Sequence, residues 1–334
     1  MKLKIFLSIA LCLLLAACSG APEEYSHDFF AMDTFMSVSA YGGAAEEGVK
    51  SAARRITELE KKLSVTDESS ELSALNRGGA VAVSPETAEL VSFALEIAEK
   101  TGGALDPTIY PVLRAWGFTT DENRVPSPEE LSALLKNVGY ERVTVDGSTI
   151  TLAEGMMLDM GAVAKGYASD ETARILRENG VTSALINLGG NIRLVGSRPD
   201  GSGWRLGIKD SSGSGNVGVL TVSDRAVVTS GSYERCFTAD GKTYGHIIDP
   251  ASGFPADNGL LSATVISEEG RLCDALSTAL FVMGAERSVE FWRENKGFDF
   301  ILITDNGEVL ITNGIADKFA LDGAHTDLSV RVVE

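Results

Sequence analysis

The stretch that decides the fold class is residues 158–180, LDMGAVAKGYASDETARILRENG. Within it, residues 162–179 have the pattern of a helix that ends at Gly180, and the following segment, 181–265, is dominated by short strand-like runs and glycine turns. A helix followed by a run of strands does not continue a regular β-α-β alternation. We therefore expect an α+β body of two packed lobes rather than a doubly wound parallel sheet.

The flanking sequence predicts further helices. Residues 44–63 carry apolar side chains at helical spacing, and residues 274–283 also have helical character. Pro85 and Pro128 each fit the first position of a helix, and the helix after Pro85 stops at Gly102. Strand patterns occupy residues 29–41, 300–304 and 309–312, and a hairpin joins 142–145 to 149–152 around Asp146-Gly147.

The composition excludes several classes of protein. The chain has 334 residues, of which 44% are hydrophobic and 23% charged, which is the balance of a folded domain rather than a disordered tail or an integral membrane protein. Its 47 Asp and Glu residues outnumber 29 Lys and Arg residues, giving a net charge of −18. An acidic surface lacks the positive footprint that non-specific nucleic-acid binding requires. We expect no nucleic-acid partner.

The N-terminus predicts export and lipidation. Lys2 and Lys4 precede an apolar run over residues 5–17, and Leu15-Ala16-Ala17-Cys18 matches a bacterial lipobox. Residues 1–17 are then a signal peptide, 18–28 a polar tether lipidated at Cys18, and 29–334 the folded domain. Acyl chains on Cys18 would anchor the protein to a membrane on the extracytoplasmic face of a bacterial cell envelope. The alternative is a secreted protein with a cysteine near its cleavage site.

Two clusters suggest binding of a nucleotide. Residues 102–108, GGALDPT, form a sharply turned loop whose main chain could hydrogen-bond a flat heterocycle, although a helix end followed by a turn explains the pattern as well. In 158–167, a glycine loop leads into a helix whose first amides could receive phosphate, with a charge from Lys165 and a hydrogen-bond acceptor at Asp159. The alternative is a helix-entry role for Asp159 and a solvated Lys165.

A third cluster contains the most informative histidine. Residues 187–191, 229–233 and 244–250 end strand-like runs with turns, where binding groups are commonly placed. His27 and His325 lie near the ends of the chain, whereas His246 lies inside patterned sequence, with Asp249 as a possible orienting partner. A satisfied structural histidine is the alternative for His246.

The fourth cluster, on the predicted helix 274–283, suggests a metal site. Asp274, Ser277 and Thr278 stand at positions i, i+3 and i+4, which share one side of a helix. One carboxylate and two hydroxyls form a hard, all-oxygen set that suits Mg²⁺ with phosphate completing its shell. The alternative is that Asp274 only caps the N-terminus of this helix.

These motifs together resemble the ApbE family, the bacterial FAD:protein FMN transferases. In chain order over residues 30–312 they are Ala31-Met32-Asp33-Thr34, Leu63-Ser64, 70–76, the 102–108 loop, Trp116-Gly117-Phe118, 164–170, 187–191, 229–235, 246–250 and 274–280. One departure is that Leu63-Ser64 is followed by Val65-Thr66, where family members usually carry an aromatic residue near the flavin.

The resemblance implies a T-fold-like, two-lobed α+β body with FAD in a cleft between the lobes. It implies a magnesium-dependent enzyme, for which manganese could substitute, that splits the pyrophosphate of FAD. The FMN half would be joined by a phosphoester to a threonine hydroxyl of a target protein, with release of AMP. Family targets are subunits of membrane redox complexes of the quinone reductase or Rnf type.

The resemblance also implies the site residues by position. The FAD site would comprise Met32, Ala104, Leu105, Asp106, Asp159, Lys165 and Ile248. The metal would be held by the carbonyl of Ala162 with Asp274, Ser277 and Thr278. Phosphoryl transfer needs charge neutralisation and in-line positioning, which gives Asp274 a catalytic part through the metal. Our own hypothesis is that His246 takes the threonine proton.

Three other hypotheses compete with transfer. In some family members water replaces threonine, which would give a FAD pyrophosphatase producing FMN and AMP. A lipoprotein that binds FAD without transferring FMN would keep the pocket but release no AMP. A structural lipoprotein with capped helices would bind no FAD.

Overall fold

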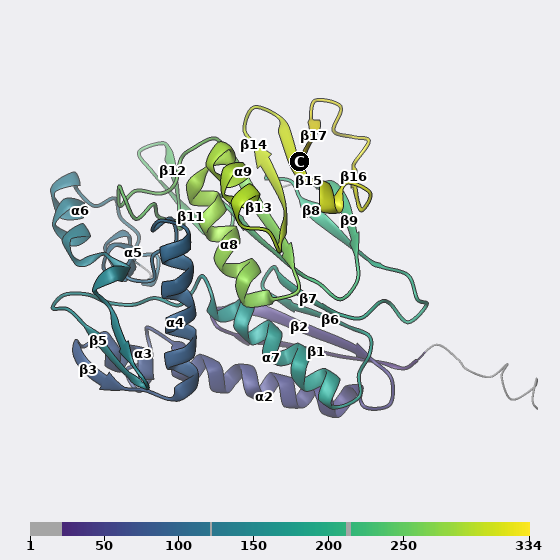
Figure 1. Cartoon of the computed structure of the whole chain (residues 1–334), viewed down its shortest axis with the longest axis horizontal. Coiled ribbons are helices and arrows are strands. Elements are labelled where there is room, and N and C mark those ends of the chain that lie inside the picture. Colours follow the sequence, from purple (N-terminus) through teal and green to yellow (C-terminus); the bar gives the residue numbers. More distant parts are fainter. Residues whose placement is uncertain (1–21, 121, 212–214) are drawn as a thin grey trace, which may run out of the picture.

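The computed structural model describes residues 22–120, 122–211 and 215–334 (Figure 1). The predicted signal peptide and the lipidation site at Cys18 lie outside the described residues. Within these ranges, no helix combines the length and the apolar character that crossing a membrane would need.

The centre of the larger lobe is a nine-stranded sheet in the order β1-β2-β6-β7-β10-β13-β14-β15-β17. Adjacent strands pair antiparallel except for the parallel pair of β15 and β17. The strands are β1 Glu24–Ala31, β2 Thr34–Tyr41, β6 Ala184–Leu188, β7 Asn191–Val195, β10 Ala226–Gly231, β13 Leu260–Ser267, β14 Asp299–Thr304, β15 Glu308–Thr312 and β17 Ser329–Val333.

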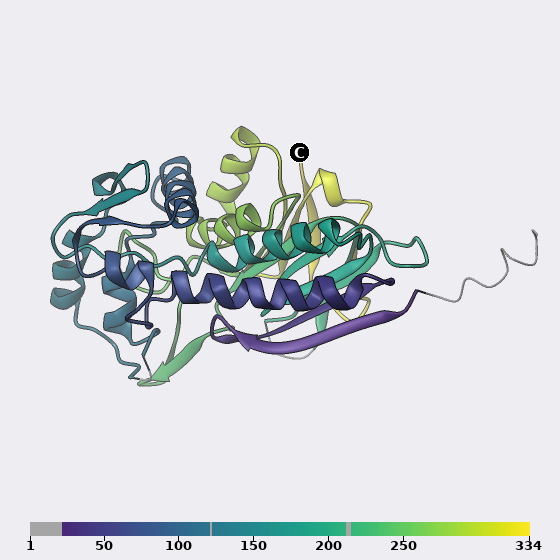
Figure 2. The ribbon, with the colours of Figure 1, turned by 90° about the horizontal axis from the view of Figure 1, so that it is seen from below.

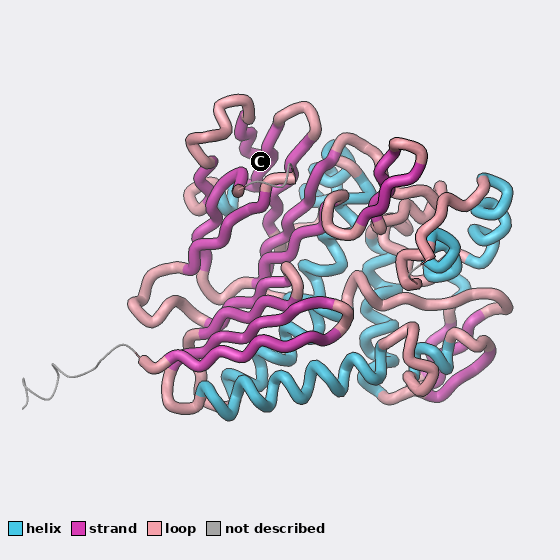
Figure 3. The backbone as a smooth tube through the Cα atoms, turned by 180° about the vertical axis from the view of Figure 1, so that it is seen from behind, coloured by secondary structure: helices cyan, strands magenta, loops and turns pink. Residues whose placement is uncertain are grey.

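Helices cover one face of this sheet, as the views from below and behind show (Figures 2 and 3). They are α2 Ala45–Leu63, α7 Ala164–Glu178, α8 Gly270–Met283 and α9 Ala285–Glu294. The other face packs against a small sheet of β8 Trp204–Lys209, β9 Asn216–Val222 and β16 Phe319–Leu321. Because side chains alternate along a strand, Val228 joins the core beneath α8 while neighbouring Val227 joins the core on the opposite face. The central strands are therefore buried on both sides.

The smaller lobe lies beside the end of α2 (Figure 1). It contains α3 Glu71–Leu75, α4 Pro85–Lys100, α5 Tyr110–Trp116, α6 Pro128–Leu134, the 3₁₀ turns η1 Leu135–Asn137 and η2 Tyr140–Arg142, and a sheet of β3 Gly79–Ala82, β5 Thr149–Leu152 and β4 Thr144–Asp146. One hydrophobic core runs through both lobes, from Leu72 and Leu90 to Phe300. Arg55 of α2 pairs with Glu86 of α4 and Glu171 of α7, so ion pairs also tie the lobes together.

A hairpin of β11 Cys236–Ala239 and β12 Lys242–Gly245 connects the sheet to the smaller lobe. Its rings Phe237 and Tyr244 pack against Trp116 of α5, with centroids 6.3 and 5.2 Å away. Trp116 Nε1 also donates to the carbonyl of Gly253 at 2.8 Å. The cluster of Trp116, Phe237 and Tyr244 supports the loop that carries His246.

The remaining short element is η3 Asn313–Ile315.

The predicted α+β class is confirmed, as are the helices beginning near residues 44, 85, 128 and 162 and the hairpin around Asp146-Gly147. Two predictions were wrong in their bounds. Residues 29–41 form two strands, because Met32 and Asp33 adopt positive φ values of 48° and 60° and reverse the chain. Glu24–Ala31 pairs with β2, so the predicted tether boundary at residue 28 falls inside β1.

Candidate functional site

A cleft formed by two adjoining cavities of about 370 and 510 Å³ lies where the two lobes meet. Phe118, Asp159, Lys165 and Arg235 line both cavities, so the two spaces are continuous. A cleft of this size suits a cofactor-sized ligand. The predicted residues that line the first cavity are Ala104, Leu105, Asp106, Asp159, Ala162, Lys165, His246, Ile248, Asp274 and Thr278, and Met32 lines the second.

The floor of the cleft is built by a close crossing of α7 and α8. A side chain at Gly166 would place its Cβ 2.3 Å from the carbonyl oxygen of Gly270 and 2.7 Å from Cβ of Asp274, so only glycine fits. This contact allows the backbone N–H of Gly166 to donate to Asp274 Oδ2 at 2.8 Å. The carboxylate of Asp274 thus caps the N-terminus of α7, and the predicted phosphate role of these first amides is filled by a protein carboxylate.

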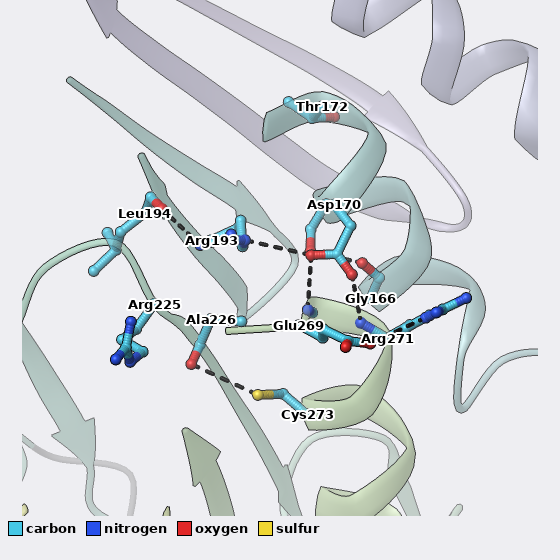
Figure 4. A network of polar contacts seen from close by, with 12 residues as sticks. Gly166, Asp170, Thr172, Arg193, Leu194, Arg225, Ala226, Glu269, Arg271 and Cys273 are labelled. Atoms are coloured by element: carbon cyan, nitrogen blue, oxygen red, sulfur yellow. Dashed lines mark hydrogen bonds and ion pairs between the residues drawn. The ribbon is translucent and has the colours of Figure 1, made fainter. Parts of the chain in front are cut away.

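Asp170 fixes the other side of the same crossing, and Figure 4 shows it turned toward Arg193 and the start of α8. Its two carboxylate oxygens accept from the backbone N–H groups of Gly270 and Arg271 at 2.7 and 3.0 Å. Arg193 Nε lies 3.3 Å from Asp170 Oδ1. Because Asp170 caps the helix, α8 begins at Gly270 rather than at residue 274. Asp274 therefore lies inside α8, and the alternative that it caps its own helix is wrong.

The oxygen atoms predicted to hold a metal separate into two groups. Asp274, Thr278 and Ala162 line the first cavity, whereas Ser277 is fully buried and does not. Ser277 Oγ donates to the Asp274 carbonyl at 2.9 Å and lies 2.9 Å from Ser230 Oγ. The hydroxyl of Ser277 is thus used in packing α8 on β10. This placement does not agree with the prediction that the Ser277 side chain is a metal ligand.

The oxygen atoms of Ala162, Asp274 and Thr278 form a part of the first cavity that we call the cation corner, and their chemistry fits a hard cation. Among the described residues, no group of three or more His, Cys, Asp or Glu side chains is placed to hold a metal, so a cation here relies on one carboxylate with hydroxyl and carbonyl oxygens. Burial raises the pKa of Asp274, partly opposed by Lys165 and by the N–H of Gly166. Within the described chain, Asp274 forms no ion pair with a basic side chain. A divalent cation would supply the missing charge.

Two residues of this corner were not predicted as site residues. Ser230 of β10 and Asn191 of β7 both line the first cavity. The side chain of Asn191 is 1% exposed, and its amide atoms have no hydrogen-bond partner in the described part of the chain. The sequence signal was present in the motifs 187–191 and 229–235, but no spacing rule distinguished these two positions from their neighbours.

Positive charge enters the cleft from two side chains. Lys165 lies in the first turn of α7, and its side chain forms no hydrogen bond or ion pair with the described residues. Arg235 reaches across to the β1–β2 turn, where it donates to the Asp33 carbonyl at 3.0 Å and lies 2.9 Å from Asp33 Oδ2. Asp159 accepts from the N–H of Gly161 at 2.9 Å, and burial raises its pKa. The cleft therefore offers a free ammonium group beside buried carboxylates.

The 102–108 loop does not contribute a free carboxylate to the cleft. Asp106 Oδ1 accepts from the N–H and the hydroxyl of Thr108 at 2.8 and 2.6 Å, and Oδ2 accepts from the N–H of Tyr140 at 3.1 Å. Burial raises the pKa of Asp106 despite these bonds. The N–H groups of Ala104 and Leu105 donate to the carbonyl and the hydroxyl of Thr101, both at 3.3 Å. These two residues therefore offer a ligand their carbonyl groups and apolar surface.

The second cavity presents aromatic surface from an unexpected element. Val65 and Thr66 line this cavity at the position where the family pattern usually has an aromatic residue. The aromatic rings that line the cavity are instead those of Phe30 and Phe118. Phe118 is already packed against Trp116 and Phe237. Phe30 is 60% exposed and contacts only the edge of Phe35 among the ring pairs described. Met32 joins the same wall, with its N–H donating to Glu60 Oε1 at 2.7 Å.

His246 is oriented by a backbone carbonyl. Its Nδ1 lies 3.2 Å from the carbonyl oxygen of Arg235, which can only accept, so Nδ1 carries the proton and Nε2 keeps a lone pair. Burial, with repulsion from Lys165 and Arg235, lowers the pKa of His246 to about 4. Asp249 instead accepts from the N–H of Ala251 at 2.9 Å. The predicted pairing of His246 with Asp249 is therefore wrong, while a neutral imidazole does line the cleft.

The two cysteines that follow Cys18 are both free. Cys236 is exposed, and Cys273 is buried with its pKa raised to about 12 by burial. The thiol of Cys273 lies 3.6 Å from the carbonyl of Ala226, at the foot of the crossing in Figure 4. A protonated, enclosed thiol is a packing group rather than a nucleophile.

Fold and cleft together define an α+β protein with a ligand-sized cleft between two lobes, in which acidic and basic groups face the same space. The ApbE family model matches residues 32–302, and the chain belongs to the ApbE family. A protein of Treponema pallidum (strain Nichols) named FAD:protein FMN transferase is 34% identical over 341 residues, covering 93% of this chain and 94% of its own. One of the same name from Vibrio cholerae is 33% identical and covers 90% and 94%.

Solved structures agree with this assignment. An ApbE protein from Thermotoga maritima matches with a TM-score of 0.81 at 32% identity, covering 90% of this chain and 98% of its own. The flavinyl transferase ApbE of Pseudomonas stutzeri, in its apo form, also has a TM-score of 0.81, at 28% identity with coverage of 91% and 99%. The two-lobed α+β architecture predicted from the motifs is confirmed.

Proposed function

We propose that this protein is a Mg²⁺-dependent FAD:protein FMN transferase. It cleaves the pyrophosphate of FAD, joins FMN through a phosphoester to a threonine hydroxyl of a target protein, and releases AMP. The observation that carries the proposal is that Asp274 and Lys165 line the same cavity, while neither side chain forms an ion pair with a described residue. The names of the 30–34% identical relatives support flavin transfer.

The residues divide the work of phosphoryl transfer. Asp274 and Thr278, with the carbonyl of Ala162, are the groups that would hold Mg²⁺ or Mn²⁺. A cation held by these groups would supply positive charge to neutralise the phosphate oxygens. Lys165 contributes a second positive charge to the pyrophosphate, and the carbonyl-oriented His246 accepts the proton of the attacking threonine at Nε2. We place the flavin ring system of FAD in the second cavity, beside Met32 and Phe30.

The remaining parts of the proposal concern place and partners. The lipobox ending in Cys18 supports a lipoprotein anchored to a membrane of the bacterial cell envelope, with the enzyme on the extracytoplasmic face. Its protein substrates are flavinylated subunits of membrane redox complexes of the quinone reductase or Rnf type. Neither assignment follows from the cleft itself.

The test mixes the mature protein with FAD, Mg²⁺ and a threonine-containing domain from such a subunit. Mass spectrometry follows the FMN adduct on the acceptor, and chromatography follows AMP. We expect equal amounts of adduct and AMP, loss of both when EDTA removes the metal, and no adduct on an acceptor whose threonine is replaced by alanine. Asp274→Asn should abolish both products while the protein stays folded.

Two outcomes would replace the proposal. AMP and free FMN without an adduct, in the presence of a competent acceptor, would identify a FAD pyrophosphatase. Tight FAD binding without AMP would identify a flavin-binding lipoprotein. Equal turnover with and without EDTA would reject the metal dependence while leaving the transfer intact.

A further inference from the structure

Asn191 is a buried polar residue without an evident structural task. It is the first residue of β7, where its backbone pairs with Leu188 of β6 and Val228 of β10. Its side chain is 1% exposed, and neither amide atom meets a hydrogen-bond partner among the described residues. An unsatisfied buried polar group costs about 1–3 kcal/mol, so a fold retains one only where something offsets that cost.

Other asparagines of this chain show what a structural amide looks like. Asn76 donates to the carbonyl of Leu158 at 2.8 Å and accepts from its N–H at 2.7 Å. Asn258 donates to the carbonyl of Phe281 at 2.8 Å, and Asn187 Oδ1 accepts from the N–H of Gly190 at 2.9 Å. Each of these side chains fixes a turn or joins two elements. Asn191 does neither.

The surroundings of Asn191 point to the cation corner. It lines the first cavity together with Asp274, Thr278 and Ser230. Its amide also approaches the Asp274 carboxylate, although the approach falls short of a full hydrogen bond. Because a carboxylate only accepts, the amide nitrogen is the atom that turns toward Asp274. The amide oxygen is then left for a group that enters the cavity.

We propose that Asn191 is a positioning residue of the cation site, with its amide nitrogen orienting the Asp274 carboxylate and its amide oxygen accepting a hydrogen bond from water bound to the divalent cation. The inference rests on the proposed function, since it assigns a new residue to the proposed metal site. Loss of a residue that orients a metal ligand typically weakens metal binding by about 10–100-fold. The unsatisfied amide is retained because the bound state satisfies it.

The experiment uses Asn191→Leu, which keeps the approximate volume and removes both polar atoms. Ser262→Ala is the matched control, because Ser262 is also 1% exposed, its hydroxyl lacks a partner in the described chain, and it lines neither cavity. Thermal unfolding of the EDTA-treated mature proteins measures stability. Electron paramagnetic resonance of free Mn²⁺, without FAD, measures the dissociation constant of the cation.

We expect Asn191→Leu to keep or raise the Tm of the metal-free protein and to weaken Mn²⁺ binding at least tenfold. Ser262→Ala should leave Mn²⁺ binding within twofold of the wild type. If leucine prevents folding, Asn191→Ala provides the same comparison. Mn²⁺ affinity within twofold of the wild type in any folded Asn191 variant overturns the inference. Failure of the wild type to bind Mn²⁺ would instead reject the metal dependence in the proposed function, so the two failures are distinguishable.

Discussion

Replacing Gly166 by alanine tests whether the crossing of α7 and α8 builds the site. The added Cβ would lie 2.3 Å from the carbonyl oxygen of Gly270 and 2.7 Å from both Cα of Arg271 and Cβ of Asp274. Two of these atoms are backbone, so a side-chain rotation cannot relieve the overlap. The helices must separate by about 1 Å to restore ordinary contact distances.

Three effects set the magnitude. Overpacking of this kind costs about 1–3 kcal/mol. Lengthening the 2.8 Å bond from the Gly166 N–H to Asp274 Oδ2 adds about 1.5–3 kcal/mol, because the acceptor is a buried charged group. Alanine recovers about 0.5–1 kcal/mol through its better helix propensity. The unfavourable effects win, and the variant should lose about 2–5 kcal/mol of unfolding free energy.

Urea unfolding of the mature protein measures this loss, and Mn²⁺ affinity reports on the displaced Asp274. Gly48→Ala in α2 is the matched control, because its new Cβ would meet first the end of the Leu176 side chain, at 3.1 Å. A flexible side chain can move, so this control should stay within about 1 kcal/mol of the wild type. A Gly166→Ala protein as stable as the Gly48→Ala protein, with unchanged Mn²⁺ affinity, would refute the reasoning.

Three further predictions concern side chains that line the cleft. Lys165→Met should raise the dissociation constant of FAD about tenfold, measured by calorimetry, while the protein stays folded, because the Lys165 ammonium group forms no hydrogen bond or ion pair with the described residues. His246→Gln should abolish transfer while FAD still binds. In the wild type the pKa of about 4 keeps His246 neutral at pH 7, so transfer should persist through pH 6 and fall only as the pH approaches 4. Because the unfolded chain takes up that proton first, wild-type stability should decline as the pH falls from about 6.5 toward 4, and His246→Gln should flatten the decline. Phe30→Ala should weaken FAD binding about five- to tenfold, whereas Phe35→Ala, which lies outside both cavities, should change it less than twofold. Equal effects of the two phenylalanine variants would show that the ring of Phe30 does not contact the flavin.

Local signals predicted the elements that carry their own start and stop residues. Ser84 accepts from the N–H of Thr87 and Pro85 fills the first helical position, so α4 begins where the sequence indicated. The start of α8 could not be found this way, because its cap is Asp170, a hundred residues earlier in the chain. β1 was missed in part because it is an edge strand with mostly exposed side chains, EYSHDFFA, and lacks the alternation of a half-buried strand.

In the candidate site, too, local sequence patterns predicted some positions, whereas others depend on packing between distant parts of the chain. Family motifs placed Asp274 and Thr278 correctly on the cavity, whereas Ser277 turns away. Each residue advances about 100° around a helix, so Ser277 and Thr278 diverge by that angle although both flank the direction of Asp274. Which of them faces the ligand depends on how β10 packs against α8, and helical spacing alone does not contain that information. Asn191 was missed for the same reason, since its unsatisfied amide is visible only once its surroundings are known.

The arrangement of charge in the cleft explains why a ligand, rather than the protein, completes the site. Lys165 influences the ionisation of Asp274, yet the two side chains form no ion pair among the described residues. The helix crossing contributes to this, because the N–H of Gly166 holds the Asp274 carboxylate at the N-terminus of α7. A direct ion pair would neutralise both groups and leave neither charge for the proposed cation and phosphate. Without an ion pair between them, Asp274 keeps a negative position for the proposed cation and Lys165 keeps a positive position for the proposed pyrophosphate.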